Sequence, residues 1–190
     1  MKTISCSFII SIILLQFSGE VLAQAFPVDL ESLKREENLW LDPHSKEGYN
    51  GAVYETEAGE IVFKGHLKNG WLHGRFEDYH LRSDSLGSKG YEKGSYENGQ
   101  RNGEFEVYGT TGKLSEKGTY LMGLRHGPYS AYHDNSRLWI KTTYVEGNWE
   151  GSYESFDRTG ILVAKGYYKT DFQCGLWIVK GKKVEFPSCK

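Results

Sequence analysis

Six histidines are the side chains of this sequence with the most obvious capacity to bind a metal ion. A zinc site needs ligand atoms about 2 Å from one shared ion, so its histidines must converge in the fold. His73 and His126 each stand directly before a glycine in similar surroundings, and His80 and His133 form a second related pair. Whether any of them can share an ion depends on the elements that separate them.

Lysines are a second recurring feature of the chain, at Lys64, Lys93, Lys117, Lys141 and Lys165. A row of cations at regular spacing could bind phosphate groups or anionic lipid headgroups. The whole chain, however, has 23 basic and 25 acidic residues and a formal net charge of -2. This balance does not predict long-range attraction to nucleic acid or to an anionic membrane.

The sequence offers no constellation that is typical of catalysis. Glu104 and Glu106 are paired carboxylates, but nothing around them predicts the enclosing pocket that would raise a pKa. No serine, threonine or cysteine comes with a base and an orienting group, and no glycine-rich turn joins a strand to a helix as phosphate-binding loops do. We therefore expect no enzymatic activity, no metal and no cofactor.

The first 25 residues predict a secretory signal peptide. Lys2 supplies the positive start, a largely apolar run follows it, and small residues place cleavage after Ala23 or Ala25. The run is shorter than the roughly 20 residues that span a bilayer. We expect export to the periplasm or the extracellular space, where the two remaining cysteines, Cys174 and Cys189, would form a disulfide.

The rest of the chain is a tandem repeat, whose units begin near glycines that are mostly 24 residues apart: Gly51, Gly74, Gly103, Gly127, Gly151 and Gly175. Two positions later comes an aromatic residue, at Phe76, Phe105, Tyr129, Tyr153 and Trp177. A second small residue recurs at Gly65, Gly94, Gly118, Thr142 and Gly166, and most units then place a tyrosine at Tyr96, Tyr120, Tyr144 and Tyr168. Glycine and aromatic residues favour turns and strands. We predict an all-β fold, an extended, twisted antiparallel meander in which residues 38–190 form one domain.

Turn residues assign a register to the hairpins, if the two-residue loops are Thr111-Gly112, Asn135-Ser136 and Thr159-Gly160. The predicted opposed pairs are Phe105 with Gly118, Glu106 with Lys117, Tyr108 with Ser115, Tyr153 with Gly166, and Glu154 with Lys165. Alternation then gives an aromatic face, with Phe105, Val107, Gly118 and Tyr120, and a polar face, with Glu104, Glu106, Lys117 and Thr119. We expect the aromatic columns to form a thin core, part of which could remain open to a partner.

The predicted spacing also decides what the recurring polar residues can do. Equivalent histidines two repeats apart would be roughly 19 Å from each other, too far to share a metal ion. Glutamates interleaved with the lysines favour a solvated Lys-Glu ladder over a phosphate site. Trp71, Trp139 and Trp149 fall outside the predicted inner column and are the candidate partner contacts, with ordinary loop packing as the alternative.

The two ends of the array differ in what the sequence predicts. Residues 26–37 are a lead segment that forms a short helical turn or stays flexible, and residues 38–41 form a strand that caps the open edge of the sheet. At the other end, a loop at Gly181-Lys182 would place Cys174 directly opposite Cys189. The expected Cα separation of roughly 4.5 to 5.5 Å suits a disulfide.

These units, most clearly Gly94-Ser95-Tyr96-Glu97-Asn98-Gly99 and the following Gln100-Arg101-Asn102-Gly103, resemble the MORN repeat, and more closely its bacterial variant in YwqK-type antitoxins. The resemblance covers roughly residues 38 to 186. It implies a β-meander that serves as an adaptor, a scaffold or a partner-binding surface, and the antitoxin label implies neutralising a toxin by direct binding. With an export signal, it implies immunity against a toxin met outside the cytoplasm.

We therefore expect a non-enzymatic exported protein that binds another protein through its β-meander surface, in an immunity or scaffold role. Nucleic acid is not an expected partner. The alternative is an envelope-associated structural module that contacts lipid or cell-surface components.

Overall fold

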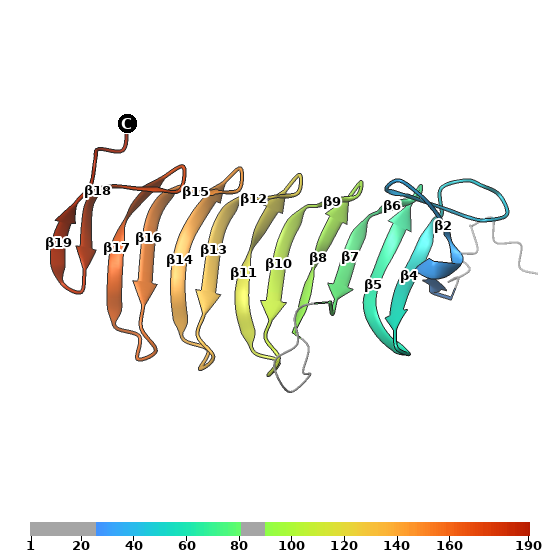
Figure 1. Ribbon diagram of the computed structural model, residues 1–190, viewed down its shortest axis with the longest axis horizontal. Helices are drawn as coiled ribbons and strands as arrows, with labels where there is room; N and C mark the ends of the chain where they lie inside the picture. The colour runs from blue at the N-terminus through green and yellow to red at the C-terminus, as the bar shows by residue number, and fades with distance from the viewer. Residues whose placement is uncertain (1–25, 81–89) are drawn as a thin grey trace, which may run out of the picture.

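The computed structural model describes residues 26–80 and 90–190 of the chain. Within these residues, 17 strands form one extended open sheet, and the strands lie side by side along the long axis of the molecule (Figure 1). The predicted signal peptide and the residues 81–89 lie outside the described residues. The predicted all-β meander is confirmed.

The long strands follow one another in chain order, each antiparallel to its neighbours. They are β4 (Gly51–Glu57), β5 (Glu60–Lys68), β7 (Gly74–Asp78), β8 (Tyr91–Glu97), β10 (Gly103–Tyr108), β11 (Leu114–Leu121), β13 (Gly127–Tyr132), β14 (Leu138–Val145), β16 (Gly151–Phe156), β17 (Leu162–Lys169), β18 (Phe172–Val179) and β19 (Lys182–Glu185). Short strands precede four of them: β6 (Trp71–Leu72), β9 (Gln100–Arg101), β12 (Leu124–Arg125) and β15 (Asn148–Trp149).

In the four units that begin at Gly74, Gly103, Gly127 and Gly151, the glycine marks a break between a short strand and the long strand that follows. Gly103 has a φ of 90° there, a left-handed conformation that suits glycine. A Cβ at Gly103 would meet no atom within 4 Å, so conformation and not space explains the residue. The 24-residue repeat of this glycine is thus a repeat of one backbone kink.

Two kinds of turn connect the strands. At one end of the sheet, two-residue turns such as Asn98-Gly99 have positive φ at both positions, 49° and 80°, as type I′ turns require. The glycine amides of two such turns also form hydrogen bonds to backbone carbonyls of the preceding repeat. The Gly123 amide donates to the Arg101 carbonyl at 2.8 Å, and the Gly147 amide donates to the Arg125 carbonyl at 2.9 Å.

At the opposite end the predicted two-residue loops are wrong. The Gly109 amide donates to the Lys113 carbonyl, so three residues separate them, and Gly112, with a φ of 73°, bonds back to the Gly109 carbonyl. This is a type I turn closed by a left-handed residue and a bulge. Asn135-Ser136 and Thr159-Gly160 lie in turns with the same bonding pattern.

The bulge explains why most of the predicted register is still right. The structure pairs Phe105 with Gly118 and Glu106 with Lys117, as predicted, and it also pairs Tyr153 with Gly166 and Glu154 with Lys165. Beyond the bulge after Val107, Tyr108 faces Leu114, so its predicted pairing with Ser115 is wrong. The extra loop residue is absorbed at the bulge and shifts only the last pair.

The buried residues of the array lie on the aromatic face. Phe105, Tyr129 and Ala131 form one buried cluster, with Val107, Tyr120, Ile140 and Tyr144 packed against it. Thr142, which replaces the second glycine, is buried opposite Tyr129 and donates its hydroxyl hydrogen to the Ser152 carbonyl. The predicted thin core is confirmed.

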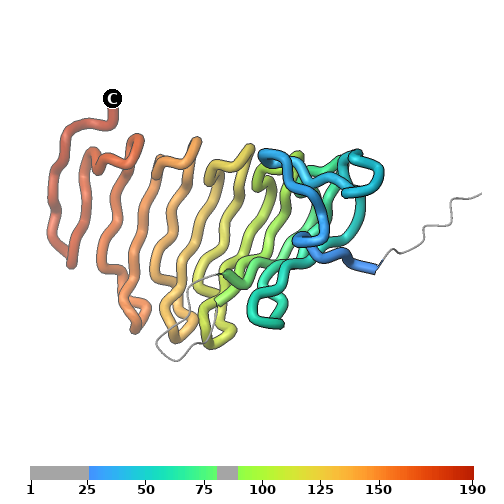
Figure 2. Tube along the Cα trace, turned by 45° about the vertical axis from the view of Figure 1, so that its right-hand side comes forward, coloured from blue at the N-terminus to red at the C-terminus, as the bar shows by residue number. Residues whose placement is uncertain are grey.

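The lead segment contains the predicted short helical turn and packs on a second buried cluster at the N-terminal end of the sheet. β1 (Val28–Asp29) pairs in parallel with β4, and the single turn of 3-10 helix η1 (Leu30–Ser32) follows. Leu30 and Leu33 are buried against a cluster that includes Val53 and Phe76. Figure 2 shows this segment, in blue, lying against the first strands.

The predicted capping strand does not reach the edge of the main sheet. β3 (Leu39–Leu41) pairs instead with β2 (Lys34–Glu36) in a separate two-stranded sheet. The edge of β4 is covered by β1, because the lead segment is held there by its two buried leucines.

At the C-terminal end, Cys174 and Cys189 form a disulfide with a Cα separation of 5.0 Å. The predicted loop is displaced by one residue, since Val179 pairs with Lys182 around Lys180-Gly181. The cysteines are therefore not a regular ladder pair. The chain after β19 continues beside β18, with the Gly175 amide donating to the Pro187 carbonyl, and this brings Cys189 to Cys174.

Candidate functional site

The polar face carries one continuous row of side chains, which we call the charge row. Its members are opposed pairwise across the strands in the order Lys64, Glu77, Lys93, Glu106, Lys117, Ser130, Lys141, Glu154 and Lys165. Lys64 Nζ lies 3.2 Å from Glu77 Oε2, and Lys93 Nζ lies 2.9 Å from Glu106 Oε2. The predicted ladder exists, with its ion pairs at the N-terminal half.

The charge row has a gap at Ser130, where the alternation would call for a glutamate. Lys117 and Lys141 face Ser130 from either side. Neither they nor Lys165 form an ion pair within residues 26–80 and 90–190. The middle of the row therefore presents exposed cations whose charge is not neutralised by a neighbouring carboxylate in contact.

Three tyrosines stand next to the ion-paired half of the row, and we call them the tyrosine cluster: Tyr79, Tyr91 and Tyr108. Tyr91 and Tyr108 stack with ring centroids 4.6 Å apart and planes at 4°, and Tyr79 lies 5.4 Å from Tyr91. Lys93 Nζ lies 4.9 Å from the centre of the Tyr108 ring, within the range of a cation–π contact.

Hydrogen bonds link the tyrosine cluster to the carboxylates of the row. Tyr108 donates its hydroxyl hydrogen to Glu106 at 2.8 Å, and Tyr79 donates to Glu77 at 2.8 Å. The bonds from Lys93 and Tyr108 hold the pKa of Glu106 below its ordinary value, and those from Tyr79 and Lys64 do the same for Glu77. Both glutamates are thus kept ionised, which suits fixed charges and disfavours a proton-donating role.

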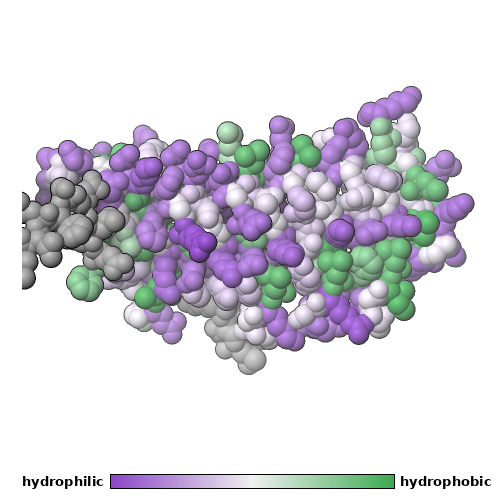
Figure 3. All heavy atoms as spheres, turned by 180° about the vertical axis from the view of Figure 1, so that it is seen from behind, coloured by the Kyte–Doolittle hydropathy of each residue, from purple (hydrophilic) through white to green (hydrophobic). Residues whose placement is uncertain are grey.

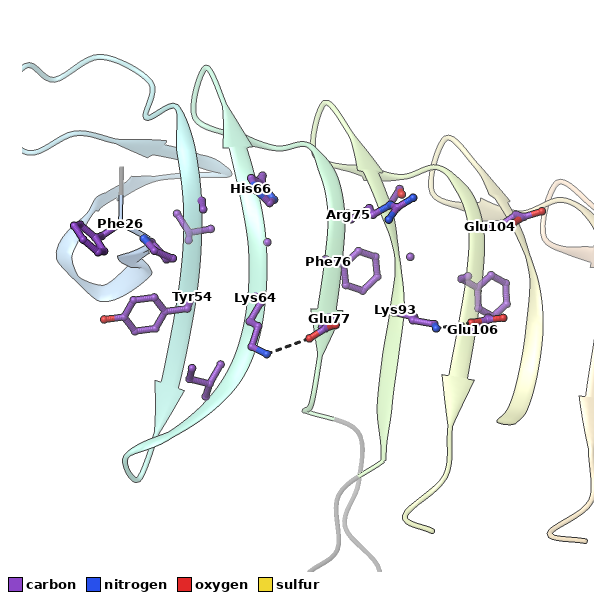
Figure 4. A pocket seen from close by; sticks show the side chains of 18 residues that line it. Phe26, Tyr54, Lys64, His66, Arg75, Phe76, Glu77, Lys93, Glu104 and Glu106 are labelled. Carbon is purple, nitrogen blue, oxygen red and sulfur yellow. Dashed lines mark hydrogen bonds and ion pairs between the residues drawn. The ribbon is translucent and has the colours of Figure 1, made fainter. Parts of the chain in front are cut away.

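An open groove of about 1150 Å³ lies over this part of the sheet. Figure 4 shows Lys64 and Glu77 joined by their ion pair, with Lys93 and Glu106 on the next two strands. His66, Arg75 and Glu104 contribute at the same face, and Tyr54 and Phe26 line the end next to the lead segment. Charged groups of both signs alternate along the groove, so it can pair with a partner surface that carries both.

The three tryptophans proposed as partner contacts are not brought together. Trp139 is 48 % exposed, and its ring centroid lies 5.7 Å from that of His133. Trp71 begins strand β6, and its ring carbon Cε3 is 2.8 Å from where a Cβ of Gly99, in the turn of the next unit, would be. The placement of Trp149 outside the inner column is wrong. Its ring contacts Tyr144, Tyr153 and Tyr168 on the aromatic face.

Arginines at the position equivalent to Trp149 support the aromatic face in two other units. The Arg125 guanidinium lies over Phe105, Tyr129 and Tyr144 at 5.1 to 5.6 Å, and its Nη2 is 2.9 Å from Glu116. Arg101 is held in the same way between Phe76 and Tyr120. It pairs with the buried Glu92, whose pKa is raised by that burial.

Sequence reasoning missed the tyrosine cluster, although a signal for it exists. Glu77 and Tyr79 are two residues apart, as are Glu106 and Tyr108, and residues two apart on a strand share a face. The repeated Glu-x-Tyr spacing could have placed both hydroxyls beside the charge row.

The described part of the chain has no group of three or more His, Cys, Asp or Glu side chains placed to hold a metal ion. None of the helices in residues 26–80 and 90–190 has the length and apolar character to cross a membrane. No protein-family model matches the chain, and a search of curated proteins returns no match.

Proposed function

We propose that this chain is an exported, non-enzymatic repeat protein that binds another protein through the polar face of its meander. The observation that carries the proposal is the tyrosine cluster, stacked beside the ion-paired half of the charge row on a face that no second layer of the described chain covers. Tyrosine is among the residue types that dominate binding energy at interfaces, because it adds large contact area with few rotatable bonds.

The charges of the row support specificity for a protein surface. Glu77 and Glu106 are held by lysines and tyrosines in fixed positions, so they do not need to be ordered on binding. Lys117 and Lys141, on either side of Ser130, offer cations to acidic side chains of a partner. Complementary charges fix the register of a complex and exclude wrong partners.

We propose export because the sequence predicts a signal peptide. Export is consistent with the Cys174–Cys189 disulfide, since disulfides persist in oxidising compartments. The resemblance to YwqK-type antitoxin repeats favours immunity against a toxin met outside the cytoplasm, and a scaffold role is the other form of the same binding function.

Capture from envelope extracts with the immobilised protein tests the proposal. The double variant Tyr91→Ala and Tyr108→Ala should lose the captured protein, because it removes the stacked pair. Tyr167→Ala is the matched control, since Tyr167 is an exposed aromatic residue outside the cluster, and it should capture as the wild type does. Equal capture by all three proteins contradicts a binding role of the tyrosine cluster, the observation that carries the proposal.

Ser130→Glu tests the charge contribution without removing any contact. It completes the alternation of the row, so a partner that uses Lys117 and Lys141 should bind more weakly while the fold is unchanged. Flotation with vesicles of anionic lipid tests the alternative function, contact with lipid. Flotation that high salt abolishes, with no protein captured, favours the lipid-contacting module instead.

A further inference from the structure

The two edges of the main sheet differ in the described structure. The β4 edge is covered in part, because β1 pairs with Val53 and Tyr54 and the lead segment packs against the adjoining buried cluster. β19 pairs on one side with β18, and no other described strand pairs with it. Figure 1 shows β19 as the last strand of the row, with the chain after it turning away.

The backbone groups that β19 presents outward can be assigned from its hairpin. Val179 and Lys182 flank the two-residue turn and so form a hydrogen-bonded pair, as do Trp177 and Val184 two residues on. The amide and carbonyl of Lys183 and of Glu185 therefore point away from β18. No hydrogen bond to these outward groups occurs within the described residues.

The chain after β19 does not cover this edge. The Gly175 amide donates to the Pro187 carbonyl, and the Phe186 amide donates to the Gly175 carbonyl, so the tail continues along β18 and not across the outer side of β19. The disulfide fixes the tail in that position. A free edge with unpaired amides is a template for another strand.

We propose that β19 pairs antiparallel with β19 of a second copy, so that two sheets join end to end as a symmetric dimer. With Val184 at the two-fold axis, Lys183 of each copy faces Glu185 of the other. These are the two residues whose backbone groups point outward, so the ladder bonds and the charge pairs form together. Edge lysines usually prevent strand pairing, but here each one meets a carboxylate.

Apolar side chains flank the proposed junction. Val184, 38 % exposed, would meet Val184 of the second copy on the aromatic face, next to the buried Trp177. Leu176, which pairs with Glu185, is 51 % exposed. In Figure 3 the apolar side chains gather toward the C-terminal end of the sheet, where β17 to β19 lie. A junction there would remove part of this apolar surface from water.

The short length of β19 limits the strength of the dimer. A four-residue strand contributes far less than the 1,200 to 2,000 Å² that stable interfaces typically bury. We therefore expect a weak, reversible dimer with a dissociation constant on the order of 0.1 to 1 mM. Sedimentation of the purified, disulfide-bonded protein at concentrations up to roughly 2 mM covers this range.

Charge reversal provides a test in which the wild-type contacts can be restored. Lys183→Glu and Glu185→Lys, each alone, place like charges opposite each other twice per dimer and should raise the dissociation constant about tenfold. In a dimer of one copy of each variant, both opposed pairs of positions 183 and 185 again carry opposite charges. A mixture of the two variants should therefore dimerise about as strongly as the wild type. Neither variant changes a buried residue.

Lys183→Pro tests the backbone bonds. Its missing amide is one that points outward, so the β18–β19 hairpin should persist while dimerisation is lost. A wild type that stays monomeric up to roughly 2 mM overturns the proposal. So does a dimer that forms equally well in Lys183→Pro and in both single charge variants, because it would then use another surface.

Discussion

Phe105 lies across Gly118, the residue directly opposite it in the ladder. Its ring carbon Cε1 is 2.9 Å from the point where a Cβ of residue 118 would stand. The ring is only 3 % exposed, because it covers backbone that has no side chain. An aromatic residue over a strand glycine recovers packing that the glycine alone would lose.

Gly118→Ala should therefore destabilise the fold by about 1 to 3 kcal/mol, since the methyl group forces the buried ring to move. Denaturant unfolding followed by tyrosine and tryptophan fluorescence measures the change. Thr111→Ala, in an exposed loop of the same hairpin, should stay within about 0.5 kcal/mol of the wild type. A Gly118→Ala protein as stable as that control would mean that the ring does not need the glycine.

Arg125→Lys should cost about 1 to 2 kcal/mol. Lysine keeps the charge, but it lacks the planar group that lies over three rings of the aromatic face. Arg158→Lys is the control, since Arg158 pairs with Asp134 at an exposed site where little stability is at stake. Thermal unfolding distinguishes them, and an equal change in both variants would contradict the stacking argument.

Breaking the disulfide with Cys174→Ser should reduce stability by roughly 3 kcal/mol in the loop-entropy model. The loss should be local, because each unit of a repeat array contacts only its neighbours. Hydrogen exchange should accelerate at the amides of β18 and β19 and stay unchanged at those of β4 and β5. Uniform acceleration along the chain would show instead that the array unfolds as one unit.

Acid should reduce the stability that ionised Glu106, bonded to Lys93 and Tyr108, contributes to the folded protein. The pKa of Glu106 is lowered in the folded protein, mainly by Lys93 and then by Tyr108, so its contribution is present above its unfolded pKa. That contribution is lost as the pH falls from about 4.5 through the lower folded value. Glu106→Gln should remove this part of the pH dependence. Stability curves from pH 7 to pH 2 that overlay for both proteins would contradict the assignment.

Much of the register could be predicted because an antiparallel hairpin has one free variable, the position of its turn. Assigning the turn to Thr111-Gly112 gave the right partners for Phe105 and Glu106, since the bulge at Val107 compensates for the extra loop residue. The residues that were placed wrongly lie beyond such irregularities. Tyr108 follows the bulge directly.

Trp149 was predicted to lie outside the inner aromatic column for a related reason. The left-handed Gly151 interrupts the strand without ending it. The short strand β15, which precedes Gly151, therefore still places Trp149 on the aromatic face. The edge cap could not be predicted either. It depends on where Leu30 and Leu33 are buried, and two apolar residues in a short segment do not specify a partner strand.

The hydrogen bonds between successive turns allow the length of the molecule to be set by the number of repeats. Because the Gly123 and Gly147 amides each attach to the preceding repeat in the same way, one unit can follow another without a change of phase. Removing residues 127 to 150 would bring Gly151 directly after His126, with every later kink and turn in step. Adding or removing a repeat should therefore change the distance between the two ends of the sheet by one hairpin, roughly 10 Å, and intermediate lengths are not accessible.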